Sequence, residues 1–169
     1  MTKLYILTKY LTFPGALIRC MWEQIICRFG KIAVEDARYV RDDEMCGHIE
    51  HEIIKSRASS VLIGLLPLLS AMTGIVAFSL FPYIFRPTSL EGTVFTGLSV
   101  WFVISFISNC FPSIEDVLNM RDRIYKESHL AFRIILAPVF GLLFVGAYLE
   151  RYCVTFIGAV VFSYFAFLL

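Results

Sequence analysis

The sequence predicts an all-α integral membrane protein with four transmembrane helices, one more polar membrane helix at the N-terminus, and a small β-hairpin on the membrane surface. Of the 169 residues, 58% are hydrophobic and only 17% are charged, whereas about 25% are charged in an average soluble protein. A chain of this length forms one domain, so we expect residues 1–169 to be a single multi-pass unit in the lipid bilayer. The net charge of +1 excludes a strongly basic nucleic-acid-binding protein.

Four apolar stretches are expected to cross the membrane, because a helix needs about 20 residues to span the hydrocarbon core. Residues 60–83 and 92–113 contain no charged side chain. Residues 132–149 and 152–169 are separated by Glu150 and Arg151. This spacing predicts a helical hairpin with a very short polar turn.

Residues 1–28 are expected to form a more polar membrane helix, since Lys9, Arg19 and Glu23 interrupt its apolar residues. A charged side chain at the bilayer centre costs several kcal/mol, so we expect the polar side to face a protein interior or a water-filled cavity. Both a full crossing and a re-entrant helix remain open. Arg19 and Glu23 are four residues apart and are expected to form an ion pair.

The segment 30–59 is crowded with charged residues and is predicted to be solvated. Within it, 32–40 and 46–54 carry β-branched or aromatic residues, and 41–44 between them is typical of a turn. A second polar loop covers 115–129. Because Lys and Arg gather in these two loops, the positive-inside rule predicts that both are cytoplasmic.

The first candidate site is a polar stripe on the N-terminal helix. Cys20, Glu23, Gln24 and Cys27 have the spacing i, i+3, i+4 and i+7, which places them on one helix face. Such a stripe can hold a metal ion or line a polar cavity. The alternative is that it packs against other polar groups.

The second candidate site contains His48, Glu50 and His51. Two histidines and a carboxylate form a known catalytic zinc set, so zinc is a possible cofactor, with Glu50 or Glu23 as general base. On a strand, however, His48 and Glu50 share one face and His51 takes the other. The alternative is a solvated, charged hairpin.

The third candidate site lies at the end of the second apolar stretch, where Asn109 is followed by Pro112 and Asp116. Pro112 is expected to stop the helix. Asp116 is either a metal ligand or, like Ser113, a candidate cap for the next helix. We expect Asp116 to cap a helix that begins near Val117.

In this order, the three sites resemble the site-2 protease family of intramembrane zinc metalloproteases. That family has a helix with a His-Glu-x-x-His motif, then a membrane-surface β-hairpin, and then a helix that ends in Asn-x-x-Pro and leads to an Asp that binds zinc. The resemblance covers residues 10–118. It carries the family's roles onto Asn109, Pro112 and Asp116.

The catalytic positions of the first helix depart from the family's pattern. With the helix exit aligned at Gly30, Cys20 replaces the first histidine, Met21 replaces the glutamate and Gln24 replaces the second histidine. The resemblance therefore implies a site-2-protease-like architecture without a conventional zinc site.

We therefore expect a pseudoenzyme that binds a peptide or membrane-protein partner, for example by strand addition at the hairpin edge. Its polar core or partner-binding residues are expected to be Arg19, Glu23, Gln24 and Asn109. Two alternatives stay open. One is a metal-dependent hydrolase with a site rebuilt from His48, His51 and Asp116. The other is a homo-oligomeric assembly or channel whose polar stripe faces a shared interior.

Overall fold

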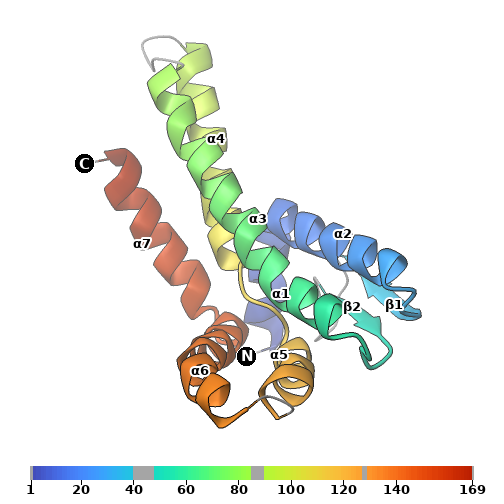
Figure 1. Cartoon of the computed structure of the whole chain (residues 1–169). Helices are drawn as coiled ribbons and strands as arrows, with labels where there is room; N and C mark the ends of the chain where they lie inside the picture. Colours follow the sequence, from blue (N-terminus) through green and yellow to red (C-terminus); the bar gives the residue numbers. More distant parts are fainter. Residues whose placement is uncertain (1, 40–47, 85–89, 127–128, 169) are drawn as a thin grey trace.

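Figure 1 shows the computed structural model of the chain, which describes residues 2–39, 48–84, 90–126 and 129–168. These residues form seven α-helices and one two-stranded sheet. The helices are α1 Thr2–Leu11, α2 Phe13–Phe29, α3 Arg57–Ile84, α4 Leu90–Ser108, α5 Ile114–Met120, α6 Leu130–Arg151 and α7 Val154–Leu168, with a π-helical turn, η1 Arg121–Tyr125, after α5. The strands are β1 Val34–Arg38 and β2 His48–His51.

Three helices are long and apolar enough to cross a membrane: Arg57–Leu80 within α3, Leu90–Ser108 and Leu130–Arg151. They correspond to three of the four predicted spans. The fourth predicted span, 152–169, contains the apolar helix α7, which has 15 residues and is shorter than a typical span of about 20.

The apolar helices α3 and α4 form a helical hairpin that runs up the view in Figure 1, and α7 packs along α4. The ring of Phe78 on α3 stacks on Phe102 of α4, with ring centroids 4.5 Å apart. Gly74 of α3 allows the two helices to lie close together, because a Cβ atom there would lie only 2.8 Å from the ring of Phe106 on α4.

The predicted single N-terminal helix is wrong, because the chain breaks at Thr12 into α1 and α2. Pro14 lies in the first turn of α2, where its missing N–H costs no hydrogen bond, whereas inside a longer helix it would break one. The carbonyl oxygen of Thr12 accepts hydrogen bonds from Ser105 Oγ at 2.7 Å and from Asn109 Nδ2 at 3.2 Å. Side chains at the end of α4 therefore provide hydrogen bonds to the backbone carbonyl group at the break.

The polarity of α1 and α2 is inverted relative to a helix of a soluble protein. Their central charged side chains, Lys9, Arg19 and Glu23, are at most 2% exposed, whereas Lys3 and Arg28 near the helix ends are exposed. Their outer faces are apolar, with exposed Leu4, Leu7, Leu11, Phe13, Leu17 and Met21. A soluble helix buries its apolar stripe and exposes its charges, so this pattern fits helices with a lipid-facing exterior.

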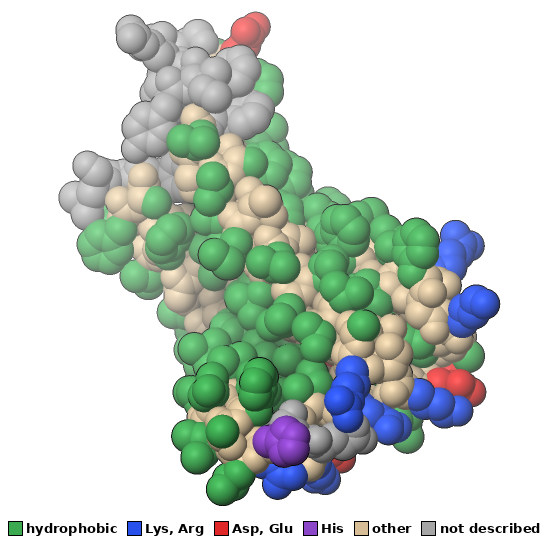
Figure 2. Space-filling model, in the orientation of Figure 1, with side chains coloured by type: hydrophobic (Ala, Val, Ile, Leu, Met, Phe, Trp, Pro, Cys, Tyr) green, Lys and Arg blue, Asp and Glu red, His purple; other side chains and the backbone are tan. Residues whose placement is uncertain are grey.

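The predicted β-hairpin is confirmed: β1 and β2 pair antiparallel, with Ala37 opposite Ile49. The turn predicted over 41–44 lies outside the described residues. Just before the hairpin, α2 ends against the start of α3, where a Cβ atom on Gly30 would lie 2.9 Å from Ser59 Oγ. In Figure 2, Lys and Arg side chains gather along the edge near the hairpin and the end of α2, while apolar side chains cover most of the remaining face.

Candidate functional site: a buried polar core and an adjoining cleft

Four charged side chains and their polar neighbours form a buried cluster between α1, α2, α6 and β2. Every member is at most 9% exposed. We call this cluster the polar core; its members are Tyr5, Lys9, Arg19, Glu23, His48, Asn109 and Glu150.

Arg19 is the centre of the polar core. Its Nε donates to Glu23 Oε1 at 3.0 Å and its Nη1 donates to Glu150 Oε1 at 2.8 Å. Its Nη2 lies 3.0 Å from His48 Nδ1. The structure thus contains the Arg19–Glu23 ion pair that the four-residue spacing predicts, and it adds a partner from α6.

Lys9 supplies the second cation. Its Nζ donates to Glu150 Oε1 at 2.5 Å and to Asn109 Oδ1 at 2.6 Å. Two ammonium or guanidinium groups therefore meet two carboxylates, which balances the buried charge. Both cations bind the same oxygen of Glu150, and its Oε2 has no hydrogen-bond partner among the described residues.

His48 is neutral in this setting, and its tautomer follows from its partners. Because Arg19 can only donate, Nδ1 of His48 accepts, and the ring proton is on Nε2, 3.3 Å from Tyr5 Oη. Burial, together with the positive charges of Arg19 and Lys9, holds the pKa of His48 well below its ordinary value.

Glu23 also closes one edge of the hairpin. Its Oε2 accepts a hydrogen bond from the backbone N–H of Ile49 at 3.2 Å. Since β1 pairs with the other edge of β2, this N–H points to the side where an added strand would bind. Strand addition on that edge would have to displace Glu23.

On the predicted polar stripe of α2, three of the four residues are buried: Cys20, Glu23 and Cys27. Gln24 is exposed and accepts a hydrogen bond from Tyr39 Oη, so it lies outside the polar core. The family alignment put the catalytic positions at Cys20, Met21 and Gln24, but Met21 is 44% exposed. These three side chains therefore do not share an interior face, whereas Arg19 and Glu23 do.

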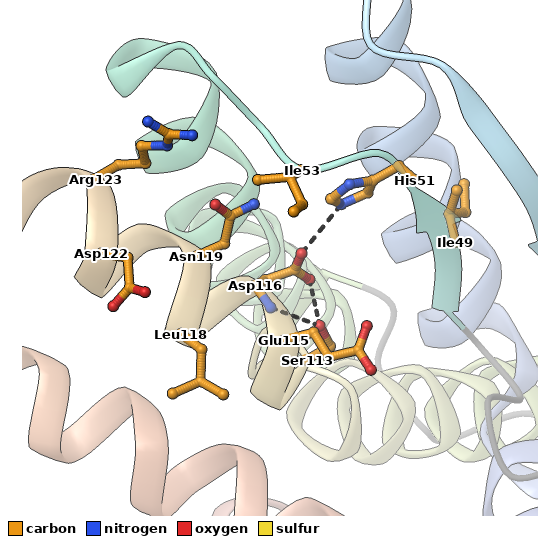
Figure 3. Close-up of a pocket in the computed structure, with 10 residues that line it drawn as sticks. All are labelled: Ile49, His51, Ile53, Ser113, Glu115, Asp116, Leu118, Asn119, Asp122 and Arg123. Atoms are coloured by element: carbon orange, nitrogen blue, oxygen red, sulfur yellow. Dashed lines mark hydrogen bonds and ion pairs between the residues drawn. The ribbon is translucent and has the colours of Figure 1, made fainter.

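A cleft of about 450 Å³ opens on the other side of β2, against α5 and η1 (Figure 3). Ile49, His51 and Ile53 line one wall, as alternate residues of an extended chain do. The opposite wall is mostly polar and includes Glu115, Asp116, Asn119 and Asp122.

At the cleft, His51 Nε2 lies 3.1 Å from Asp116 Oδ1, and His51 Nδ1 lies 2.9 Å from the carbonyl oxygen of Glu52. Both ring nitrogens thus face acceptors, which favours the doubly protonated imidazolium. The hydrogen bond to Asp116 raises the pKa of His51 to about 9, against an opposing effect of burial.

The expectation that Asp116 caps the next helix is wrong, because α5 begins at Ile114 and its N-cap is Ser113. Ser113 Oγ accepts from the backbone N–H of Asp116 at 3.0 Å and donates to Asp116 Oδ2 at 2.7 Å. The order Ser113, Asp116, His51 differs from a nucleophilic triad, in which the histidine contacts the serine.

Of the three ligands expected for a rebuilt hydrolase site, His51 and Asp116 meet at the cleft, but His48 lies apart from them. His48 lies in the polar core and His51 in the cleft, on opposite faces of β2, as strand alternation predicts. Glu50 pairs in register with Asp36 of β1 and does not line the cleft. Within the described residues, no three His, Cys, Asp or Glu side chains form a group that could hold a metal ion.

Glu150 and Tyr5 belong to the polar core but were not predicted from the sequence, which placed Glu150 in a turn. The available signal was the charge count of the membrane segments. Lys9 and Arg19 bring two positive charges into apolar surroundings and Glu23 brings one negative charge, so a second carboxylate was needed. Glu150, between two apolar stretches, was the nearest candidate.

The chain matches no protein-family model, no curated protein and no solved structure.

Proposed function

We propose that this chain is a non-catalytic, multi-pass membrane protein, similar to site-2 proteases in the order of its elements, which binds a short extended segment of a membrane or peptide partner. In this arrangement the two charged loops, 30–59 and 115–129, lie on the cytoplasmic side. Helix α7 is then a fourth membrane helix, and α1 and α2 are embedded in lipid.

The observation that carries the non-catalytic part is the identity of the buried pair on α2. In the family motif, two metal ligands stand four residues apart on a helix face that looks into the protein. Here the pair with that spacing whose side chains are in contact is Arg19 and Glu23, which are 1% and 2% exposed. An arginine stays protonated and has no lone pair to give to a metal ion.

Asp116, the residue that the resemblance assigns as a zinc ligand, already contacts two other side chains. One carboxylate oxygen faces the His51 ring and the other accepts from Ser113. The residues present therefore do not fit the zinc site of the family, and no hydrolytic step is assigned to them.

The cleft between β2 and α5 is the surface that supports partner binding. It combines the side chains of Ile49, Ile53 and Leu118 with hydrogen-bonding groups such as Asn119. Binding sites are typically concave and combine apolar walls with a few polar groups that fix orientation. Ile53 is 73% exposed, and a bound segment would cover its apolar side chain.

Site-specific photo-crosslinking in native membranes tests the proposal. A photoreactive residue at Ile53 should give one discrete adduct that maps to a single partner segment. At Leu142, which is 62% exposed on α6, the same residue should crosslink to lipid. Filling the cleft with Asn119→Trp should abolish the Ile53 adduct.

The recovered partner should be uncut. A partner cleaved at the crosslinked segment would favour the hydrolase alternative, and identical adducts at Ile53 and Leu142 would contradict the assignment of the cleft.

A further inference from the structure

The guanidinium group of Arg19 is surrounded by three side chains that commonly act as ligands of cations. Its three nitrogen atoms contact Glu23 Oε1 at 3.0 Å, Glu150 Oε1 at 2.8 Å and His48 Nδ1 at 3.0 Å. These partners come from α2, α6 and β2. One planar cation thus links three elements that are far apart in the sequence.

His48 behaves here as a ligand. It directs the lone pair of Nδ1 at the guanidinium, and its other nitrogen donates to Tyr5 Oη. A second group that holds the outer N–H in this way is what fixes the tautomer and orientation of histidines that bind cations.

The charges around this group favour a cation at its position. Without Arg19, the carboxylates of Glu23 and Glu150 would face the single ammonium group of Lys9, which leaves one uncompensated negative charge in a buried site. Burying an unpaired charge is strongly unfavourable.

The three ligands match a planar organic cation better than a metal ion. A zinc ion needs its ligands at about 2.0 to 2.3 Å, whereas these groups are spread around a guanidinium, each at hydrogen-bond distance from a different nitrogen. A fork of N–H donors that points outward in one plane fits this spread.

We propose that Glu23, His48 and Glu150 form a binding site for a planar guanidinium-type cation, and that the chain fills this site with its own Arg19. The polar core then depends on a tethered cation and not on an ion taken from solution. This holds whether or not the cleft binds a partner.

Chemical rescue of Arg19→Ala tests the proposal. In detergent, Arg19→Ala should lower the thermal unfolding midpoint, and ethylguanidinium, which resembles the deleted side chain, should restore most of the loss with saturable concentration dependence. The same concentration of tetramethylammonium should have no such effect. Wild-type protein, with the site filled, should not be stabilised by either ion.

A second substitution identifies the site. In the Arg19→Ala background, His48→Ala should weaken the ethylguanidinium effect at least tenfold in concentration, whereas Lys126→Gln, on the exposed end of η1, should not. If Arg19→Ala does not accumulate, the yield of folded, monodisperse protein made with and without ethylguanidinium is the readout. Absence of rescue in either format, or rescue by zinc in place of ethylguanidinium, would overturn the proposal.

Discussion

His48 and His51 lie three residues apart on β2, yet their rings point to opposite sides of the strand and differ in charge. His48 accepts a hydrogen bond from Arg19 and is neutral, whereas His51 faces the Asp116 carboxylate and the carbonyl of Glu52 and is cationic at neutral pH. The polar core therefore holds one face of the strand, and α5 holds the other. Both contacts restrict where the hairpin can move.

The His51–Asp116 contact should make stability depend on pH in the alkaline range. The pKa of His51 is about 9 in the folded protein, above its unfolded value of about 6.5. The stabilisation is therefore fully present below pH ~6.5 and is lost as the pH rises through about 9. The difference in unfolding free energy between wild type and His51→Gln should shrink over this range. A difference that does not change with pH would contradict the assignment.

Asp116 and Ser113 should differ in what their substitution changes. Asp116→Asn removes the carboxylate charge, so the pKa of His51, followed by NMR in micelles, should fall toward its ordinary value. Ser113→Ala removes the N-cap of α5 and should cost about 0.5 to 2 kcal/mol. An unchanged His51 pKa in Asp116→Asn would show that the two side chains do not interact.

The Arg19–Glu23 pair should show strong coupling in a double-mutant cycle. Arg19→Leu leaves Glu23 buried without its cation and should cost about 3 to 5 kcal/mol of unfolding free energy. Arg19→Leu combined with Glu23→Leu should cost less, because no unpaired charge remains at the pair and Lys9 still neutralises Glu150. Chemical denaturation in detergent measures both. Equal losses would exclude the interaction.

Two glycines provide a matched test of the packing between α2 and α4. A Cβ atom on Gly15 would lie 2.2 Å from the backbone oxygen of Ser105, so Gly15→Ala should cost about 1 to 3 kcal/mol. Gly97, within α4, has no atom within 4 Å of such a Cβ. Gly97→Ala should therefore be neutral or stabilise by up to about 1 kcal/mol. Similar thermal midpoints for both variants would contradict the close α2–α4 contact.

The proposed topology can be tested by labelling with a membrane-impermeant maleimide in a background that lacks Cys46 and Cys110. Cysteine at Glu52, exposed next to β2, should react only after permeabilisation. Cysteine at Glu91, at the far end of the α3–α4 hairpin, should react in intact cells. The reverse pattern would invert the assigned orientation.

Local patterns in the sequence predicted the apolar helices and the hairpin because each depends on neighbouring residues. Apolar runs identify α3, α4 and α6, and the residue types of 32–40 and 46–54 identify the strands. The break at Thr12 could not be predicted in the same way. It is stabilised by Ser105 and Asn109, which lie 93 and 97 residues further along the chain.

The orientation of α2 shows the same limit more sharply. Helical spacing groups Cys20, Glu23 and Gln24, but it does not say which part of the helix surface faces the protein. The orientation of α2 is set by Glu150 and His48, which bind Arg19. Gln24 then lies outside the polar core, where it contacts Tyr39. Two residues brought in from other elements thus changed which side chains form the site.

Because the members of the polar core are far apart in the sequence, they must assemble in a fixed order as the chain is synthesised. Lys9 and Arg19 both bind Glu150, which the ribosome adds more than 130 residues after either of them. Until then, the first two helices present cations to the membrane without this carboxylate, and isolated charges are costly there. In a nascent chain truncated before Glu150, α1 and α2 should therefore not be fixed in their final position in the bilayer. They should reach it only after α6 has been synthesised and Glu150 binds Lys9 and Arg19.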